Sequence, residues 1–389
     1  MRKLIIFLSF LFLSGCLPSA SFPPLTFQGL DRPLKPGDII ATRSGEIISP
    51  DTLIDHLSEN QVVYVGETHT SLADHRIQFQ ILEGLYRKNP ELVLALEMFP
   101  RRVQPVLDRF AAGALTEEDF IREVNWAEVW GYPFQLYRPL LTFARDRGLK
   151  IVGLNAPREV VNKIARQGLA ALSPEERREV AEMFLTEDSK YREALALEFQ
   201  RHRSEKIKDF DSFYEAQRTW DETMAETLVR TLQTRPSSAQ ALVVIGKGHI
   251  TDRMGMPPAA ARRWPQPYKT VVPVPIDYPL RVLDPNLADY LWITEAFMES
   301  HPPRLGLQVK PLGSGRGLEV LEVTPGGPAA RAGFRTGDVI IRAGGEPVRS
   351  VEDLHRLFSG RPEKVSFTLM RSGRELTLEV SWQAPVEKN

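Results

Sequence analysis

The sequence predicts an α/β domain built on a parallel sheet, followed by a smaller β-rich domain. Apolar runs of strand length recur in the first 250 residues, at 62–65, 92–96, 150–155 and 241–245. Segments of helical length separate these runs, and this alternation makes the strands parallel. Beyond residue 304 the turns and the apolar pattern change, which indicates a separate domain.

Length and composition narrow the class of protein. The chain has 389 residues, enough for two or three domains. Its 42% hydrophobic and 25% charged residues are typical of globular domains, and its net charge of −1 argues against nucleic acid as a partner. Cys16 is the single cysteine, which excludes an internal disulfide and a cysteine-based metal site.

Residues 1–16 are expected to be a signal peptide. Arg2 and Lys3 precede an apolar run over 4–13, too short to span a bilayer. Leu13-Ser14-Gly15-Cys16 resembles the lipobox of bacterial lipoproteins, which implies cleavage before Cys16 and lipidation of its thiol; an ordinary signal peptide is the alternative. Leu17 follows, as in lipoproteins sorted to the outer membrane. We therefore expect an exported chain, held in the membrane by lipid alone and facing the periplasm.

The next segments lead into the sheet. Prolines in 17–39 predict a tether, and 37–49 predicts a hairpin with Ser44-Gly45 at its turn. After the first core strand, apolar residues at helical spacing predict an amphipathic helix over 71–88. A second helix is predicted over 101–112, broken early by Pro105.

Thr116 is expected to cap a helix that ends at Val124. The aromatic stretch 125–137 suits the wall of a flat hydrophobic pocket, or else a core plug or subunit contact. Tyr137 is expected to open a helix that ends at Arg147, before the third core strand.

The second half of the α/β domain contains a long helical excursion over about 156–234, a subdomain or lid, with a capping box that begins at Ser173. A fifth strand over 271–276 is expected at a sheet edge, because prolines cannot donate to a central ladder. Residues 277–303 predict a proline-containing linker with a short helix over 287–299. The α/β domain is thus expected to span 40–276.

Polar side chains follow the predicted core strands. Because parallel strands end at one edge, one cleft should receive Glu67, His69, Glu97, Asn155 and His249. Further residues expected to line this cleft are Gly66, His75, Gly246 and Gly248. Glutamate and histidine suit a divalent metal such as zinc, or general acid and base chemistry without one. Singly, each of these residues can equally be a buried, hydrogen-bonded polar group.

Segments 62–85, 94–113, 152–161 and 243–257 resemble the ChaN family of iron-regulated haem-binding lipoproteins, in a superfamily with Tiki and TraB proteins. The resemblance covers about 40–276 and implies an α/β fold with a helical excursion, haem binding or uptake, and a lipid anchor. It also implies a tyrosine ligand for haem, for which Tyr132, Tyr137 and Tyr214 are candidates, and a homodimer. Asp221 fits the family's late helix. Related positions in the wider superfamily act as metal ligands or catalytic groups of hydrolases.

The last segment resembles Deg-type bacterial PDZ domains. The match lies in residues 304–307 and 324–340, and 351–354 begins the helix beside the groove. Such a domain over 304–383 would add a peptide as a strand and bind its C-terminal carboxylate through loop amides. The resemblance implies these residues for peptide binding: Leu305, Gly306 and Leu307 through amides, and His355 and Phe358 for selectivity.

Two functions are therefore expected from the sequence. The first is a haem- or iron-handling envelope lipoprotein whose PDZ domain docks a peptide or protein C-terminus. The alternative is a hydrolase of peptide or ester bonds with a regulatory PDZ domain, in which Glu67, His69, Glu97 and His249 bind metal or transfer protons.

Overall fold

The structure is a computed structural model that describes residues 23–185, 189–202, 209–297, 305–313, 317–351, 353–354, 357 and 364–381. These residues form an α/β domain and a small β domain, each with its own hydrophobic core. Cys16 and the expected signal peptide lie outside the described residues. In the described ranges, no helix has the length and apolar character needed to cross a membrane.

The α/β domain is built on an eight-stranded sheet with the order β3-β2-β10-β8-β4-β7-β5-β6. Its strands are β2 (Ile39–Ala41), β3 (Glu46–Ile48), β4 (Val62–Glu67), β5 (Leu92–Pro100), β6 (Lys150–Asn155), β7 (Gln240–Gly246), β8 (Tyr268–Pro275) and β10 (Tyr290–Thr294). Strands β4 to β8 and β10 are parallel, whereas β2 and β3 form an antiparallel hairpin. The predicted parallel α/β core is confirmed.

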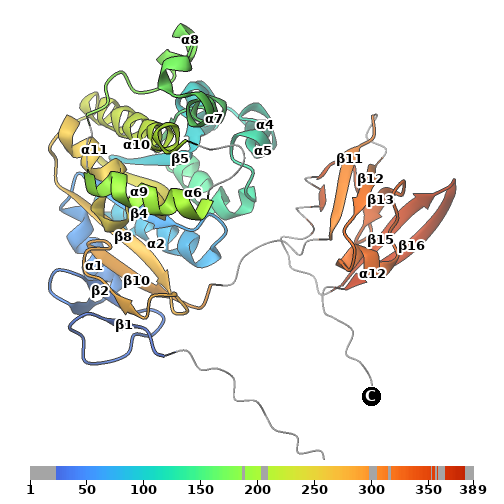
Figure 1. The fold of residues 1–389 in the computed structure, drawn as a ribbon, viewed down its shortest axis with the longest axis horizontal. Helices are drawn as coiled ribbons and strands as arrows, with labels where there is room; N and C mark the ends of the chain where they lie inside the picture. Colours follow the sequence, from blue (N-terminus) through green and yellow to red (C-terminus); the bar gives the residue numbers. More distant parts are fainter. Residues whose placement is uncertain are drawn as a thin grey trace, which may run out of the picture.

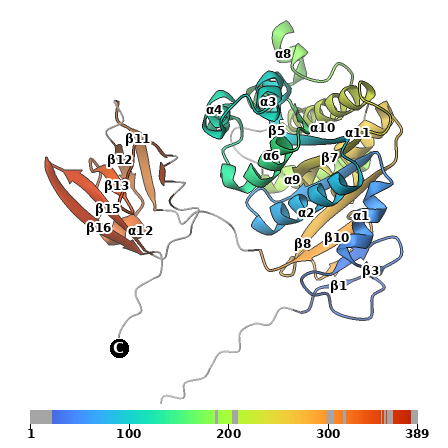
Figure 2. The same ribbon diagram turned by 180° about the vertical axis from the view of Figure 1, so that it is seen from behind.

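Helices cover both faces of the sheet, as the opposite views of Figures 1 and 2 show. One face carries α1 (Pro50–Ser58), α2 (Leu72–Lys88), α3 (Gln104–Ala111), α4 (Glu117–Glu123), α5 (Trp126–Val129) and α6 (Phe134–Asp146). The other face carries α10 (Phe210–Gln233) and α11 (Met256–Arg263). Both faces of the strands are therefore apolar and buried, as parallel sheets require.

The excursion between β6 and β7 is helical, as predicted. It contains α7 (Arg158–Gln167), η2 (Leu169–Ala171), α8 (Pro174–Arg178), α9 (Ser189–His202) and α10. The capping box between Ser173 and Glu176 is present at the start of α8. Short 3-10 turns elsewhere are η1 (Arg101–Val103), η3 (Lys247–His249) and η4 (Thr251–Arg253).

Three predictions that were based on the positions of prolines are wrong. Pro105 does not break its helix but lies in the first turn of α3, where no N–H partner is needed. The segment expected as a tether packs on the domain from Pro23 onward. Its Leu25, Phe27 and Leu34 are buried, and β1 (Thr26–Phe27) pairs with β9 (Val282–Leu283). Prolines exclude helix there, but they leave apolar side chains able to pack.

The third error concerns β8, which lies inside the sheet between β10 and β4 rather than at an edge. Ile276 of the segment after β8 donates its N–H to the Thr294 carbonyl of β10. Backbone N–H groups along a strand point alternately to its two neighbours, so the backbone nitrogens of Pro273 and Pro275 point away from β10, toward the β4 side. Pairing with β4 has already ended at Val271 on that side. The missing proline N–H groups therefore interrupt no ladder.

The helix predicted over 287–299 is also wrong. Residues Tyr290–Thr294 form β10, every residue of which is buried, between β2 and β8. The stretch is apolar on both faces, and such a short run does not distinguish a strand from a buried helix by its period. The sheet thus extends beyond residue 276 to Thr294.

The β domain has a sheet with the order β11-β12-β13-β15-β16, and β14 pairs with β13. Its elements are β11 (Leu307–Pro311), β12 (Leu318–Val323), α12 (Pro328–Ala332), β13 (Val339–Ala343), β14 (Glu346–Pro347), β15 (Lys364–Arg371) and β16 (Arg374–Ser381). The predicted small β-rich domain is confirmed. Strand β11 is an edge of the sheet that the described residues form.

Candidate functional site

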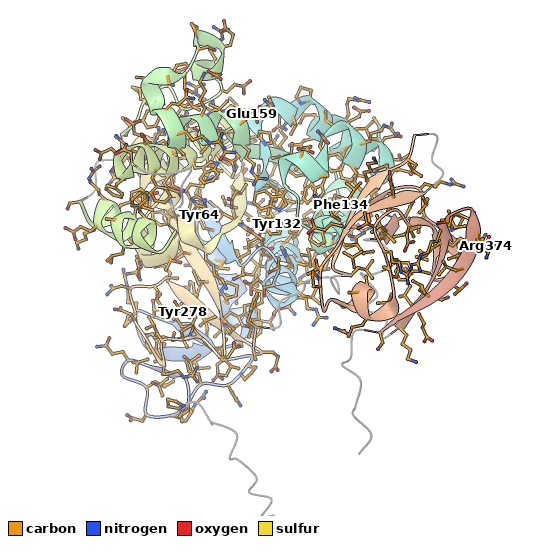
Figure 3. All side chains as sticks on the ribbon, turned by 45° about the vertical axis from the view of Figure 1, so that its right-hand side comes forward. Tyr64, Tyr132, Phe134, Glu159, Tyr278 and Arg374 are labelled. Atoms are coloured by element: carbon orange, nitrogen blue, oxygen red, sulfur yellow. The ribbon has the colours of Figure 1, made fainter. Side chains whose placement is uncertain are left out.

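A cavity of about 970 Å³ lies where the parallel strands β4, β5, β6 and β7 end. His69, Glu97, Asn155 and His249 all line it, so the strand ends meet as the sequence predicts. Tyr132 and Glu159, labelled in Figure 3, lie on its wall and rim. Glu67 is the last residue of β4 and lies fully buried behind His69.

Glu67 is surrounded by hydrogen-bond donors. Its Oε1 accepts from His69 Nδ1 at 2.8 Å and from the Tyr137 hydroxyl at 2.7 Å. Its Oε2 accepts from Gln78 Nε2 at 2.8 Å and lies 3.4 Å from His75 Nδ1. Burial alone would raise the pKa of Glu67, but His75 and His69 lower it to about 2. Glu67 is therefore a fixed carboxylate that orients His69.

The His69 ring lies between two aromatic side chains. Ring centroids are 4.8 Å apart for His69 and Trp130, and 4.9 Å for His69 and Tyr132. Burial opposes protonation, yet the hydrogen bond to Glu67 and the charge of Glu97 raise the pKa of His69. Because Glu67 holds Nδ1, Nε2 is the nitrogen that can meet a ligand, and the side chain is 28% exposed beside the cavity.

His249 lies between two carboxylates. Its Nδ1 is 2.7 Å from Asp221 Oδ1, and its Nε2 is 3.5 Å from Glu97 Oε1. Burial opposes its charge, but Asp221 and Glu97 raise the pKa of His249 well above its usual value. Burial also raises the pKa of Asp221, in spite of His249 and of the hydroxyl that Tyr191 donates to it. Both ring nitrogens of His249 are thus held by protein groups.

Glu97 and Gly246 lie between His69 and His249. Glu97 Oε2 accepts the Gly246 N–H at 2.5 Å. Burial would raise the pKa of Glu97, but the charges of His249 and His69 lower it. A Cβ on Gly246 would lie 3.0 Å from His69 Cε1 and 3.4 Å from Glu97 Oε2. The absence of a side chain here lets both groups approach the end of β7.

Other residues expected in the cleft lie outside its lining or behind it. Asp221 is buried behind His249, and His75 is buried behind Glu67. Gly66 packs beneath Ile250 and Lys247, each 3.1 Å from where a Cβ would stand. Gly246 and Gly248 do not contribute to the lining formed by the described residues either.

The three candidate tyrosines differ in position. Tyr132 lines the cavity. Tyr137 is buried and donates its hydroxyl proton to Glu67. Burial and the charge of Glu67 raise the pKa of Tyr137 well above its usual value, which disfavours the phenolate that would bind iron. Tyr214 lies on α10 beside Tyr191, outside the cavity lining that the described residues form. Tyr132 is thus the tyrosine placed to meet a ligand.

Several residues of the site were not identified from the sequence. Gln78 bonds Glu67, Tyr191 bonds Asp221, and the Trp220 ring lies 5.9 Å from that of His249. Gln78 follows His75 by three positions on α2, so helical spacing could have found it. Tyr191 carried no such signal, because its partner lies in another helix.

The zinc alternative finds no support in this geometry. Within the described ranges, no group of three or more His, Cys, Asp or Glu side chains is arranged to hold a metal ion. The nitrogen and oxygen donors instead bind one another in the pairs Glu67–His69 and Asp221–His249.

In the β domain, the loop expected to bind a peptide precedes the edge strand β11. Gly306 has a φ of 74°, and its carbonyl accepts from Thr324 N at 2.8 Å. Leu305 is buried and accepts from Ala329 N at 2.9 Å, and Leu307 begins β11. His355 and Phe358 lie outside the described residues.

The fold and the site define an α/β ligand-binding domain with a polar, aromatic cleft at the ends of its parallel strands, joined to a peptide-binding type of β domain. The chain belongs to the haem-binding uptake family of the Tiki superfamily, ChaN, whose sequence model matches residues 53–259. A PDZ domain matches residues 303–381. Both resemblances seen in the sequence are thereby confirmed.

Similar proteins exist for both parts. "Cofacial heme binding to ChaN of Campylobacter jejuni" is a solved structure with a TM-score of 0.53 and 20% identity, covering 67% of this chain and 98% of its own; it supports the fold. Reticulata-related 5 of Arabidopsis thaliana is 24% identical over 270 residues, which is 62% of this chain and 35% of that protein. A probable periplasmic DegP-like serine endoprotease of Halomonas elongata is 42% identical over 84 residues, 19% and 18% of the two chains. The chain thus matches about a third or less of these two relatives.

Proposed function

We propose that this chain binds haem in the cavity at the ends of β4, β5, β6 and β7. The volume of about 970 Å³ is at the upper end of typical small-molecule pockets. Trp130 and Tyr132 supply aromatic wall, and Arg158 in the lining supplies a cation suited to a propionate, as does Arg102 if it exchanges its ion pair with Glu159 for one with haem. Membership in the haem-binding uptake family supports the same ligand.

The observation that carries this proposal is the imidazole of His69, which Glu67 orients at the wall of the cavity. The iron of haem accepts an axial nitrogen or oxygen ligand from the protein. His69 Nε2 is available for this bond because Glu67 holds Nδ1 at 2.8 Å, and a carboxylate on the other nitrogen raises the basicity of a ligating imidazole. Tyr132, whose ring is 4.9 Å from that of His69, is the alternative ligand.

A hemin titration of the full chain, followed by absorbance, tests this assignment. We expect His69→Ala to weaken hemin binding by more than about 100-fold. Removing a residue that only hydrogen-bonds a metal ligand costs about 10–100-fold in affinity, and removing the ligand itself should cost more. Tyr132→Phe should change affinity only modestly, and Tyr137→Phe and Tyr214→Phe should retain the spectrum. Loss of the Soret band in Tyr132→Phe alone would reassign the ligand to that tyrosine, and no saturable band in the wild type would refute haem binding.

We further propose that Cys16 is lipidated and that the chain faces the periplasm from the outer membrane, where its PDZ domain binds the C-terminus of a partner. The lipobox supports the anchor, and the edge strand β11 with the loop around Gly306 supports addition of a peptide strand. Mass spectrometry of the membrane-purified chain tests the lipid. Peptides that bind with a free but not an amidated C-terminus would support the groove assignment.

Hydrolysis is a second candidate function, favoured by the Asp221–His249–Glu97 arrangement. Asp221 orients the His249 imidazole, and the Glu97 carboxylate lies on the other side of that ring. In such an arrangement Glu97, which lines the cavity, can exchange a proton with a water molecule bound there. An ester or peptide substrate whose turnover is lost in Glu97→Gln, with hemin binding retained, would establish it.

A further inference from the structure

Exposed apolar side chains gather where the described chain begins. Leu280 is 65% exposed and Val282 is 61% exposed, among the most exposed large apolar side chains of the described residues. Val282 lies in the short strand β9 and Leu280 lies in the bend just before it, whereas the neighbouring Leu283 is buried in the core. A single exposed leucine is ordinary, but a cluster suggests a contact surface.

Two aromatic residues belong to the same loop region. Tyr278 is half-buried, and Phe297 is 37% exposed with its N–H bonded to Asp277 Oδ1 at 2.9 Å. We call Tyr278, Leu280, Val282 and Phe297 the apolar tip. Figure 3 shows Tyr278 at one end of the α/β domain and Glu159, on the cavity rim, at the other.

Arg281 fastens the start of the described chain to this tip. Its Nε donates to the Pro23 carbonyl at 2.6 Å, and its Nη1 donates to the carbonyls of Ile276 at 3.1 Å and Tyr278 at 2.9 Å. Thr26 N donates in turn to the Arg281 carbonyl at 2.8 Å. Pro23 is seven residues from Cys16. Fully extended, such a segment reaches at most about 25 Å.

We propose that the apolar tip docks on the lipid bilayer, with Leu280 and Val282 entering the interface beside the anchor. This inference rests on the proposed lipidation of Cys16, which would hold the tip close to the membrane. Tyrosine and phenylalanine suit the boundary between acyl chains and headgroups. Docking in this way directs the cavity rim at Glu159 away from the membrane, toward soluble ligands and partners.

The chemistry of the tip specifies a neutral lipid surface. The Arg281 guanidinium is bonded to backbone carbonyls, and the Asp277 carboxylate accepts the Phe297 N–H. Asp277, Asp284 and Glu295 are exposed in the same region, so acidic side chains outnumber the Arg281 cation there and attraction to anionic lipid is small. We therefore expect docking on phosphatidylcholine vesicles that does not weaken when salt is raised.

The test places an environment-sensitive label on the lipidated full-length chain in phosphatidylcholine vesicles. Leu280→Cys and Val282→Cys carry the label on the tip, and Leu197→Cys on α9, where Leu197 is 60% exposed, is the matched control. Cys16 is the single native cysteine, so labelling of the unsubstituted chain reports whether its thiol is acylated. Acyl chains brominated near the headgroup should quench both tip labels several-fold more than the control label.

Each other result has a distinct meaning. Unquenched tip labels on an acylated chain that floats with vesicles would overturn the docking and leave the anchor standing. A reactive Cys16 thiol without flotation would overturn the anchor, and the docking with it. Tip labels already shielded in detergent would mean that another protein surface covers the tip, which also overturns the proposal.

Discussion

The two histidine–carboxylate pairs of the cleft border one cavity but differ in how they are held. His69 binds one carboxylate, Glu67, through Nδ1 and has Nε2 left for a ligand. His249 lies between Asp221 and Glu97, so both of its nitrogens face protein groups. The comparison shows that similar residue types are held in two ways: His69 has one ring nitrogen bonded to a carboxylate and lies beside the cavity, and His249 keeps a buried charge between two carboxylates.

The carboxylates differ in the same way. Glu67 has several donors, and its pKa falls to about 2 in spite of burial. Burial raises the pKa of Asp221, even with His249 and Tyr191 as donors. The Glu67–His69 pair is thus a firmly ionised support for one imidazole. The Asp221–His249 pair depends on the neighbouring Glu97 for its charge balance.

The largest expected effect is on stability when His249 is removed. His249→Ala leaves Asp221 and Glu97 buried without their cation, and breaking a buried pair in this way costs about 3–5 kcal/mol. His69→Ala should cost only about 1–3 kcal/mol, because Glu67 keeps Tyr137 and Gln78 as donors. Urea unfolding of the hemin-free chains at pH 7 measures both. Equal losses would contradict the assigned roles.

The next effect is a pH dependence that belongs to Glu67. A carboxyl whose folded pKa is lowered from 4.5 to about 2 stabilises the fold above pH 4.5 and loses that contribution as the pH falls toward 2. The shift corresponds to roughly 3 kcal/mol. Between pH 6 and pH 2 the wild type should therefore lose about this much more stability than Glu67→Gln. Urea midpoints across this range measure it.

An exposed carboxylate provides the control for this titration. Glu91→Gln, at an exposed position before β5, should follow the wild-type curve. A Glu67→Gln curve that runs parallel to the wild type over the whole range would mean that Glu67 is not held as a low-pKa carboxylate.

The sequence predicted the strand ends because β4, β5, β6 and β7 have strong local signals: buried apolar runs that stop at polar residues. It could not separate Tyr132 from Tyr137, because the decisive contact, Tyr137 with Glu67, joins residues 70 positions apart. The same limit applies to β10, for which the sequence pattern predicts a helix. Its strand state is fixed by pairing with β2 and β8, not by its own pattern.

The smallest expected effect lies where the two pairs meet. A Cβ at Gly246 would stand 3.0 Å from His69 Cε1 and 3.4 Å from Glu97 Oε2. Glu97 is fixed by the Gly246 N–H and faces His249, whereas the His69 ring borders the cavity, so His69 should be the group that moves. Gly246→Ala should therefore weaken hemin binding several-fold. Its stability should change by less than about 1 kcal/mol, because alanine restricts the unfolded chain.

Gly248→Ala is the matched control, since a Cβ there meets nothing within 4 Å and the backbone φ is not positive. It should leave hemin affinity and stability as in the wild type. A Gly246→Ala chain that lost stability but kept its affinity would show that Glu97 yields instead. The Asp221–His249 pair would then be the adaptable one and Glu67–His69 the rigid one, which reverses the roles that the geometry assigns.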